Sequence, residues 1–522
     1  MIFGSFVGPF VPEIVLLAAT LLVFLLDVVG VRRIEISGGI GVVGIAIAFV
    51  FVLADLGFAP LAGLATIPAA QIDVVPTTQL YAFTSLGLVF QLIFLTAAFL
   101  VALASMSRPS GERGAPIFYG LLTLATLGML LVAVANDLIF LLLAIEITSI
   151  ATYLLVAYTR SDARSLEAAM KFYIIGALST TLSFFGASLL YGAYGTTNLA
   201  AIAGLGSAGV PTLVLLGYGF LIAGLAFKAT VVPFHAWAVD VYDGAPNDVS
   251  AFLAGGSKKI GLFAFFLVFL GPILAVRAVG GATLPFGGGP FNVGPVLQIA
   301  LATLAVLTMT VGNVLALLQK EMKRMLAYSS ISQAGYMLIG ITVGTAPALA
   351  GATLQIFAHV LMKGGAFLVV GAVAGLGVGP LIADWRGLGA KRPYLGVAFA
   401  LMLLSLAGVP LTIGFWSKFV LFSAAVEAQG YFVWLAVAGL LNSALSVFYY
   451  ARVLKVMFFD APDPAAAAPV PTYPGLALGG IGWGRAAAIA IAAAVIVAVG
   501  VYPQPVLGAI QAAAQHFVSS GV

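Results

Sequence analysis

Apolar runs of roughly 20 residues recur from one end of this chain to the other, and each is long enough to cross the hydrocarbon core of a membrane as a helix. Hydrophobic residues make up 62% of the chain and charged residues only 8%, which excludes an ordinary soluble globule. Helices fit these runs and open strands do not, because lipid cannot satisfy an exposed backbone. The sequence therefore predicts an all-α polytopic membrane protein.

Clusters of glycine and proline divide the apolar runs into about 14 expected transmembrane helices. We expect one integral membrane domain over residues 1–522, with helices 1–3 in 1–107, helices 4–8 in 115–277, helices 9–13 in 295–458 and helix 14 in 483–503. The first run has no basic residue before it, so we interpret it as a permanent span and not as a signal peptide.

Basic residues indicate how the helices are oriented. Most lysines and arginines outside the apolar runs fall in alternate connections, for example Arg32, Arg160, Lys320 and Arg386. The opposite connections hold a single arginine, Arg277. The positive-inside rule then places both termini on the non-cytoplasmic side of a prokaryotic cell (inner) membrane.

The chain contains no cysteine, which excludes disulfides, thiolate metal sites, iron–sulfur clusters and cysteine nucleophiles. Only three histidines are present, and His516, near the end of the chain, is expected to be solvated. We therefore expect no metal and no cofactor in this chain. If the protein serves a redox enzyme, its electron carriers lie in other subunits, and nothing indicates nucleic-acid binding.

Ionisable residues within the apolar runs are the costly exceptions in such a chain, and they mark functional sites by default. They are Glu146 and six lysines: Lys171, Lys228, Lys258, Lys259, Lys363 and Lys418. A buried lysine can release its proton near neutrality, whereas an arginine effectively cannot. The exclusive use of lysine therefore favours a path for protons or other cations over a purely structural use of charge.

Two of the apolar runs carry a proline beside a lysine. They read "LAFKATVVPFHAW", with Lys228 and Pro233, and "LAGVPLTIGFWSKF", with Pro410 and Lys418. A proline within a helix removes a backbone hydrogen bond and breaks or kinks the helix. The breaks fall in helices 7 and 12, which are five helices apart. Because five is an odd number, the two helices cross the membrane in opposite directions. This pattern predicts two inverted five-helix repeats with an ion site at the breaks.

Each candidate residue also has a structural interpretation. Glu146 and Lys228 could form an ion pair that only joins two helices, and Lys258, Lys259 or Lys418 could extend to a helix end. His235 follows the first break, where it could cap free carbonyls or transfer protons. Lys171 is expected near the cytoplasmic end of helix 6, close enough to influence Glu146 or Lys228.

His359 and Lys363 are four residues apart, so we expect them to share one face of helix 11. A glycine-rich segment, "AGGSKK", has a faint likeness to a phosphate-binding loop, but no strand precedes it and its spacing is wrong.

Six segments together resemble the N subunit of respiratory complex I, one of the antiporter-like membrane subunits of NADH–quinone oxidoreductase. They are "VPEIVLLAATLLVFLLDV", "LLLAIEITSIATYLLVAY", "FKATVVPFHAWAVDVYDGAPNDVSAFLAGGSKKIGLF", "MKRMLAYSSISQAGYML", "GVPLTIGFWSKFVLF" and "YYARVLKVMFF". The resemblance covers nearly the whole chain and implies proton transfer through the middle of the membrane.

The resemblance also implies roles for individual residues. Glu146, Lys228, Lys258 and Lys418 match the proton-transfer residues of helices 5, 7, 8 and 12, and the lysine at the last of these positions favours the N type over the M type. Five more residues are possible participants: Lys171, His235, Lys259, His359 and Lys363. The chain departs from its relatives at Gln333, where they often carry histidine.

The expected function is that of a proton-translocating subunit of NADH–quinone oxidoreductase that performs no redox chemistry itself. NADH, FMN, iron–sulfur clusters and quinone are expected in partner subunits, and M-type and K-type subunits are the expected neighbours in a hetero-oligomer. Two alternatives remain open. One is a subunit of a multi-subunit sodium/proton exchanger, and the other is a scaffold that does not pump.

Overall fold

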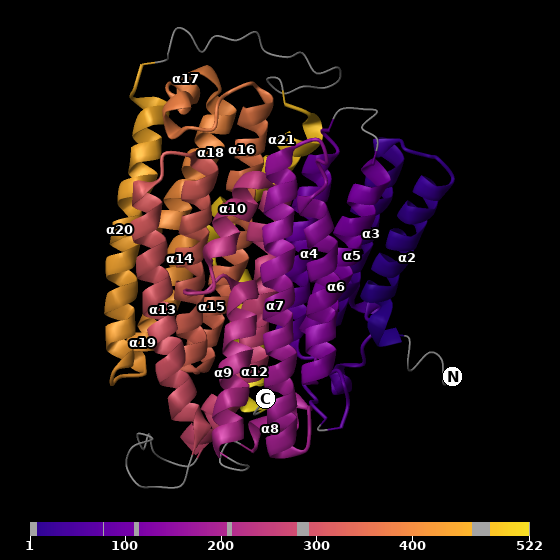
Figure 1. The fold of residues 1–522 in the computed structure, drawn as a ribbon, viewed down its shortest axis with the longest axis vertical. Coiled ribbons are helices and arrows are strands. Elements are labelled where there is room, and N and C mark those ends of the chain that lie inside the picture. The colour runs from indigo at the N-terminus through magenta and orange to yellow at the C-terminus, as the bar shows by residue number, and fades with distance from the viewer. Residues whose placement is uncertain are drawn as a thin grey trace.

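The computed structural model describes residues 8–76, 78–108, 114–205, 211–278, 292–461 and 481–520 of the chain. The described part is a bundle of long helices that run along one common direction (Figure 1). Apart from short 3-10 turns and three isolated β-bridges, the described residues form helices and connections without a β-strand. The prediction of an all-α membrane protein is confirmed.

The helices follow one another in a simple order. In the first half they are α2 (Val11–Val28), α3 (Ile34–Asp55), α4 (Ser85–Ser105), α5 (Ala115–Ala133), α6 (Leu138–Val156), α7 (Ala163–Tyr194), α8 (Leu199–Ala203), α9 (Pro211–Ala229), α10 (Ala236–Gly244), α11 (Asn247–Phe252) and α12 (Lys258–Ala278). In the second half they are α13 (Val293–Leu318), α14 (Met322–Val343), α15 (Ala346–His359), α16 (Gly365–Gly375), α17 (Leu388–Lys391), α18 (Pro393–Ala407), α19 (Ile413–Glu427), α20 (Phe432–Phe458), α21 (Trp483–Val501) and α22 (Gln504–Ser519).

Twelve segments of the described chain are long and apolar enough to cross a membrane. The two further spans that the sequence predicts correspond to α14, which begins with charged residues, and to the pair α18 and α19, each of which is too short by itself. The count of about 14 and the inverted relation between the two halves stay predictions.

Both expected helix breaks are present. The first separates α9 from α10, and Thr230 has a φ of 58° there. The second separates α18 from α19, with a φ of 93° at Gly408 and 66° at Leu411. Positive φ angles cannot continue a right-handed helix, so the chain leaves the helical path at both places.

Two helices at the centre of the bundle each contain a π-helical turn. One turn, η4 (Leu253–Ser257), joins α11 to α12, and the other, η5 (Val360–Gly364), joins α15 to α16. The two turns contact each other through one glycine each: a Cβ added to Gly255 would lie 3.6 Å from the Cα of Gly364. These spans are 89% and 94% buried, against 33% for α7, so they form the interior of the bundle. Single π-helical turns within α-helices are often found at functional sites.

The last helix, α22, is absent from the predicted set of spans. Its apolar residues, including Leu507, Ile510 and Phe517, are buried, whereas His516 on the other face is exposed, as expected. The helix packs against α15 and α4.

Candidate functional site

The structure brings most of the predicted residues into one buried row. Lys228, Lys258, Lys259, His359, Lys363 and Lys418 are each at most 5% exposed. They come from α9, the start of α12, the end of α15, η5 and α19, which are all interior parts of the bundle. Glu146 on α6 is half-buried. Lys171 and His235 lie outside this row.

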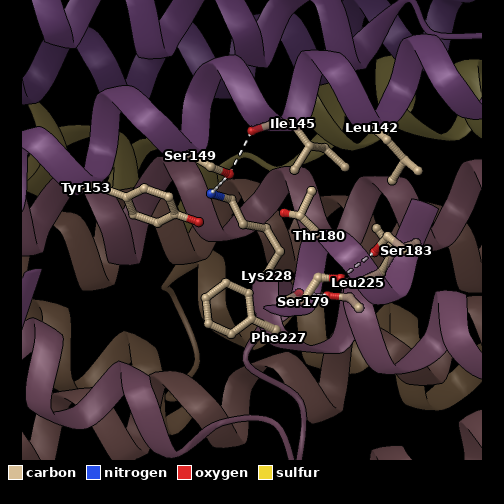
Figure 2. Close-up of a pocket in the computed structure, with 11 residues that line it drawn as sticks. Leu142, Ile145, Ser149, Tyr153, Ser179, Thr180, Ser183, Leu225, Phe227 and Lys228 are labelled. Atoms are coloured by element: carbon tan, nitrogen blue, oxygen red, sulfur yellow. Dashed lines mark hydrogen bonds between the residues drawn. The ribbon is translucent and has the colours of Figure 1, made fainter. Parts of the chain in front are cut away.

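Lys228 at the end of α9 contacts α6 through a hydroxyl group. Its Nζ donates a hydrogen bond to Ser149 Oγ at 2.9 Å, and Ser149 Oγ donates to the carbonyl of Ile145 at 2.8 Å (Figure 2). A cavity of about 20 Å³, with room for about one water molecule, lies beside this lysine.

Glu146 does not pair with Lys228 directly. Its carboxylate accepts a hydrogen bond from Thr180 Oγ1 on α7. Among the described residues, no ion pair of 4.0 Å or less joins the two charges, so the expected direct ion pair is wrong. Each charge has another partner instead: Glu146 bonds to Thr180 of α7, and Lys228 bonds to Ser149 of α6.

Three lysines and a histidine form a cluster around the two π-helical turns. Lys258 Nζ donates to the Ser330 carbonyl at 2.5 Å, and Lys363 Nζ donates to Ser329 Oγ at 2.7 Å. Lys259 Nζ lies 2.8 Å from His359 Nδ1. Within the described chain no carboxylate lies in hydrogen-bonding distance of these four side chains. Their protons are therefore held by hydroxyl, carbonyl and imidazole acceptors, which cannot neutralise a charge permanently.

His359 and Lys363 hydrogen-bond to different helices. His359 ends α15 and meets Lys259 of α12, whereas Lys363 lies in η5 and meets Ser329 of α14. Their expected shared helix face stays a prediction.

Lys418 lies where the second helix break exposes backbone carbonyls. Its Nζ donates to the carbonyls of Leu406 and Ala407 at 2.8 and 3.1 Å, and to Ser443 Oγ at 2.8 Å. Because α18 ends at Ala407, these carbonyls have no partner within the helix. They also form the negative end of the helix dipole, which favours a cation. The break and the lysine therefore make one site.

Gln333 on α14 belongs to a chain of amide groups beside this site. Gln355 Nε2 donates to Gln333 Oε1 at 2.5 Å, and Ser417 Oγ donates to Gln355 Oε1. Gln333 Nε2 is buried and has no hydrogen-bond partner among the described residues. The position that often holds histidine in relatives therefore carries a polar group that does not titrate.

Lys171 lies in an ion cluster at one end of the bundle. It is 43% exposed and contacts Glu167 at 2.8 Å and Asp240 at 3.1 Å, while Arg324 contacts Asp240 at 3.1 Å. A cavity of about 180 Å³ opens beside these groups. Its ion-pair partners are therefore Glu167 and Asp240, and the expected influence of Lys171 on Glu146 or Lys228 stays a prediction.

His235 precedes α10 and makes no side-chain capping hydrogen bond. At the first break, Trp237 Nε1 donates to the Phe227 carbonyl at 3.0 Å. His235 Nδ1 is buried and has no partner among the described residues, while the ring interacts with the Pro233 backbone. The two roles expected for His235, capping a carbonyl and transferring protons, stay predictions.

Sequence reasoning missed the partners of the lysines. They are small hydroxyl side chains on neighbouring helices: Ser149, Ser329, Ser330 and Ser443. Serine is common at helix interfaces, so only its position beside a buried lysine distinguishes these four from other serines.

A buried acid was missed too. Glu13 on α2 is 4% exposed, and it accepts a hydrogen bond from Gln91 Nε2 at 2.7 Å. The sequence feature that could have identified Glu13 is its position within an apolar run.

The chain is similar to proteins of one membrane family. The family described as "NADH:quinone oxidoreductase/Mrp antiporter, TM" matches residues 135–446. Subunit N of the F(420)H(2) dehydrogenase of Methanosarcina mazei is 37% identical over 97% of this chain and 98% of its own length. NADH-quinone oxidoreductase subunit N of Trichlorobacter lovleyi is 41% identical over 77% of this chain and 79% of its own length.

A solved structure has the same fold over nearly the full length. A chain of respiratory complex I from Thermus thermophilus is 31% identical and superposes with a TM-score of 0.74, over 95% of this chain and 98% of that chain. These relatives agree with the resemblance that the motifs indicate.

Proposed function

Because this chain belongs to the family of membrane subunits shared by NADH:quinone oxidoreductases and Mrp antiporters, we propose that it is an N-type, proton-translocating subunit of a membrane-bound quinone oxidoreductase. It moves protons through the buried lysine row, coupled to quinone reduction in other subunits. NADH, FMN, iron–sulfur clusters and quinone belong to those subunits, and this chain performs no redox chemistry itself.

One observation carries the proposal. The row runs through both halves of the chain, and the lysines of its central cluster have no carboxylate partner among the described residues. A permanent ion pair would hold a proton in place, whereas hydroxyl and imidazole partners accept and release one. Buried cations without counter-ions are costly in a membrane, so a scaffold has no reason to keep them.

The energies involved are of matching size. Moving one elementary charge across 100 mV costs about 2.3 kcal/mol. A change of two pKa units in a transfer group corresponds to about 2.7 kcal/mol. Modest changes in the surroundings of the lysines are therefore sufficient to drive a proton against a membrane potential.

The proposed cycle begins at Glu146 and Lys228. Lys228 carries the proton while Glu146 lies close by, and a change in the position of Glu146 releases that proton toward Lys258. It then passes to Lys418, which delivers it to the non-cytoplasmic side. Since Glu146 is only half-buried, a neighbouring subunit that covers α6 and α7 can reach it. We propose that M-type and K-type subunits are the neighbours in this hetero-oligomer.

A cation/proton antiporter of the multi-subunit sodium/proton exchanger type is the second candidate, because the same family includes Mrp antiporters. The two sequence relatives reported above, 37% and 41% identical to this chain, are named as subunits of redox enzymes, which favours the first proposal. A scaffold without pumping activity is the third candidate, and the unpaired lysines speak against it.

Purification of the native assembly tests the proposal. A tag placed on this chain should recover flavin- and iron–sulfur-containing subunits, and sealed vesicles should take up protons when quinone is reduced. Testing NADH and the deazaflavin F420H2 in parallel would identify the electron donor, since the relatives are named for both. Sodium/proton exchange without electron transfer, in an assembly free of flavin, would instead establish the antiporter.

A further inference from the structure

Helix α20 presents a row of hydroxyl groups to the interior of the bundle. Ser443, Ser446, Tyr449 and Tyr450 are spaced at three and four residues and therefore share one helix face. Each is at most 9% exposed. We call these four side chains the α20 hydroxyl row. It covers eight residues, with about 10 Å of helix between the first and the last.

The two ends of this row contact two lysines that are far apart in the chain. At one end, Ser443 Oγ accepts the hydrogen bond from Lys418 Nζ at 2.8 Å. At the other end, the Tyr450 hydroxyl is hydrogen-bonded to Ser329 Oγ, which accepts from Lys363 Nζ at 2.7 Å. The row therefore connects the central lysine cluster to the lysine of the second helix break.

The interior of the row is polar throughout. Ser446 Oγ donates to the Ser443 carbonyl at 2.6 Å. The Tyr449 hydroxyl lies among the hydroxyls of Tyr450, Ser329 and Ser446, and the rings of the two tyrosines are 4.4 Å apart. Tyr449 also donates to Asn313 Oδ1 at 2.9 Å, which fixes the orientation of its hydroxyl.

A second polar connection reaches the same lysine, but its chemistry differs. The chain from Gln333 through Gln355 to Ser417 ends one residue before Lys418. An amide has separate donor and acceptor atoms, so it cannot accept a proton at one atom and release another from that same atom. A hydroxyl oxygen does both. Of the two connections, only the hydroxyl row suits proton transfer.

We propose that the α20 hydroxyl row carries the proton from Lys363 to Lys418, and that the amide chain only holds α14, α15 and α19 together. This inference rests on the proposed function and names the route within it. In each step an O–H or N–H bond breaks as a new O–H bond forms on the next hydroxyl oxygen. Ser446 Oγ donates to the Ser443 carbonyl, so its hydroxyl turns from that carbonyl to Ser443 Oγ to pass the proton on. The last proton binds the neutral amine of Lys418. No electron is transferred, and rotation of the hydroxyls resets the row.

The test uses the assembled complex in sealed vesicles. Tyr450→Phe keeps the ring and removes one hydroxyl, and Ser446→Ala removes another. In each variant, the loss of proton translocation should be at least about half of the loss in Lys418→Ala. A positioned proton-transfer group contributes roughly 10²–10⁴-fold in rate, so its removal should slow translocation strongly. Electron transfer in the presence of an uncoupler should remain, which distinguishes a lost proton route from a complex that fails to assemble.

Two further variants serve as controls. Tyr218→Phe changes a buried tyrosine of α9 whose hydroxyl has no hydrogen-bond partner among the described residues, and it should translocate normally. Ser446→Thr restores a hydroxyl and should recover translocation that Ser446→Ala loses. A purely structural role for Ser446 would not predict this recovery.

The outcomes separate the route from the function. Full translocation in Tyr450→Phe and Ser446→Ala, with loss in Lys418→Ala, would overturn the hydroxyl route and leave the proposed function intact. Loss in Gln355→Met with full translocation in Tyr450→Phe would assign the route to the amide chain and equally overturn this inference. Full translocation in Lys418→Ala would overturn the proposed function itself.

Discussion

Replacing Lys418 by arginine or by methionine separates its charge from its ability to release a proton. Arginine keeps a positive charge and several donors for the carbonyls at the end of α18, but it cannot be deprotonated in a protein. Methionine removes both the charge and the donors. We expect Lys418→Arg to assemble with near-normal stability and to lose proton translocation. Lys418→Met should lose proton translocation and should also be less stable.

The size of the stability loss follows from the contacts at the break. Ala407 O keeps a second donor in Lys418→Met, because Ser443 Oγ lies 3.2 Å from it. Leu406 O loses the only side-chain donor found for it in the described structure. One buried carbonyl without a partner costs about 1–3 kcal/mol, and removing a buried charge offsets part of this. We therefore expect a net destabilisation of about 1–2 kcal/mol, within that range.

Two measurements check this reasoning. Protons translocated per electron pair, measured in sealed vesicles, report the proton path, and thermal unfolding of the purified assembly reports the capping of α18. A Lys418→Arg complex that translocates as well as the unaltered one would remove Lys418 from the path. If Lys418→Met were as stable as the unaltered complex, the lysine would have no role in satisfying the helix end.

Three further predictions follow from other sites. Glu146→Gln should assemble but lose translocation and slow quinone reduction, and Glu146→Asp should be milder; normal pumping by the glutamine variant would show that this charge is not needed. Asp248→Ala should destabilise the complex by about 3 kcal/mol in thermal unfolding, since it removes a buried carboxylate that two partly buried arginines, Arg485 and Arg108, contact at 2.9 and 3.3 Å; an unchanged unfolding temperature would contradict this. Single cysteines at the exposed positions Ser161 and Gln429 should react with an impermeant reagent from the cytoplasmic and the opposite side, respectively, and reversed labelling would overturn the orientation.

Much of the site was visible in the sequence. A lysine within an apolar run is rare, and five of the six such lysines are buried, the exception being Lys171. The two proline-containing runs predicted the helix breaks, because proline restricts the backbone wherever it occurs. These predictions succeed because they depend on local chemistry and on the solvent.

The sequence-based expectations failed where a distance between helices mattered. Glu146 and Lys228 carry opposite charges, yet Glu146 bonds to Thr180 and Lys228 bonds to Ser149. Lys171 lies in an apolar run but reaches the ion cluster around Asp240 at the end of the bundle.

The sequence by itself therefore determined that this is a helical membrane protein. It also determined where the helices break and which side chains within them are ionisable. These features can be predicted because an unpaired polar group in lipid is unfavourable at any position in the chain. Only the tertiary structure decided what each lysine contacts. His359 meets Lys259 of α12 and Lys363 meets Ser329 of α14, and the end of α18 supplies the carbonyls that bind Lys418. Such partners come from residues far apart in the chain, and their distances depend on how the helices pack rather than on the spacing within any one helix.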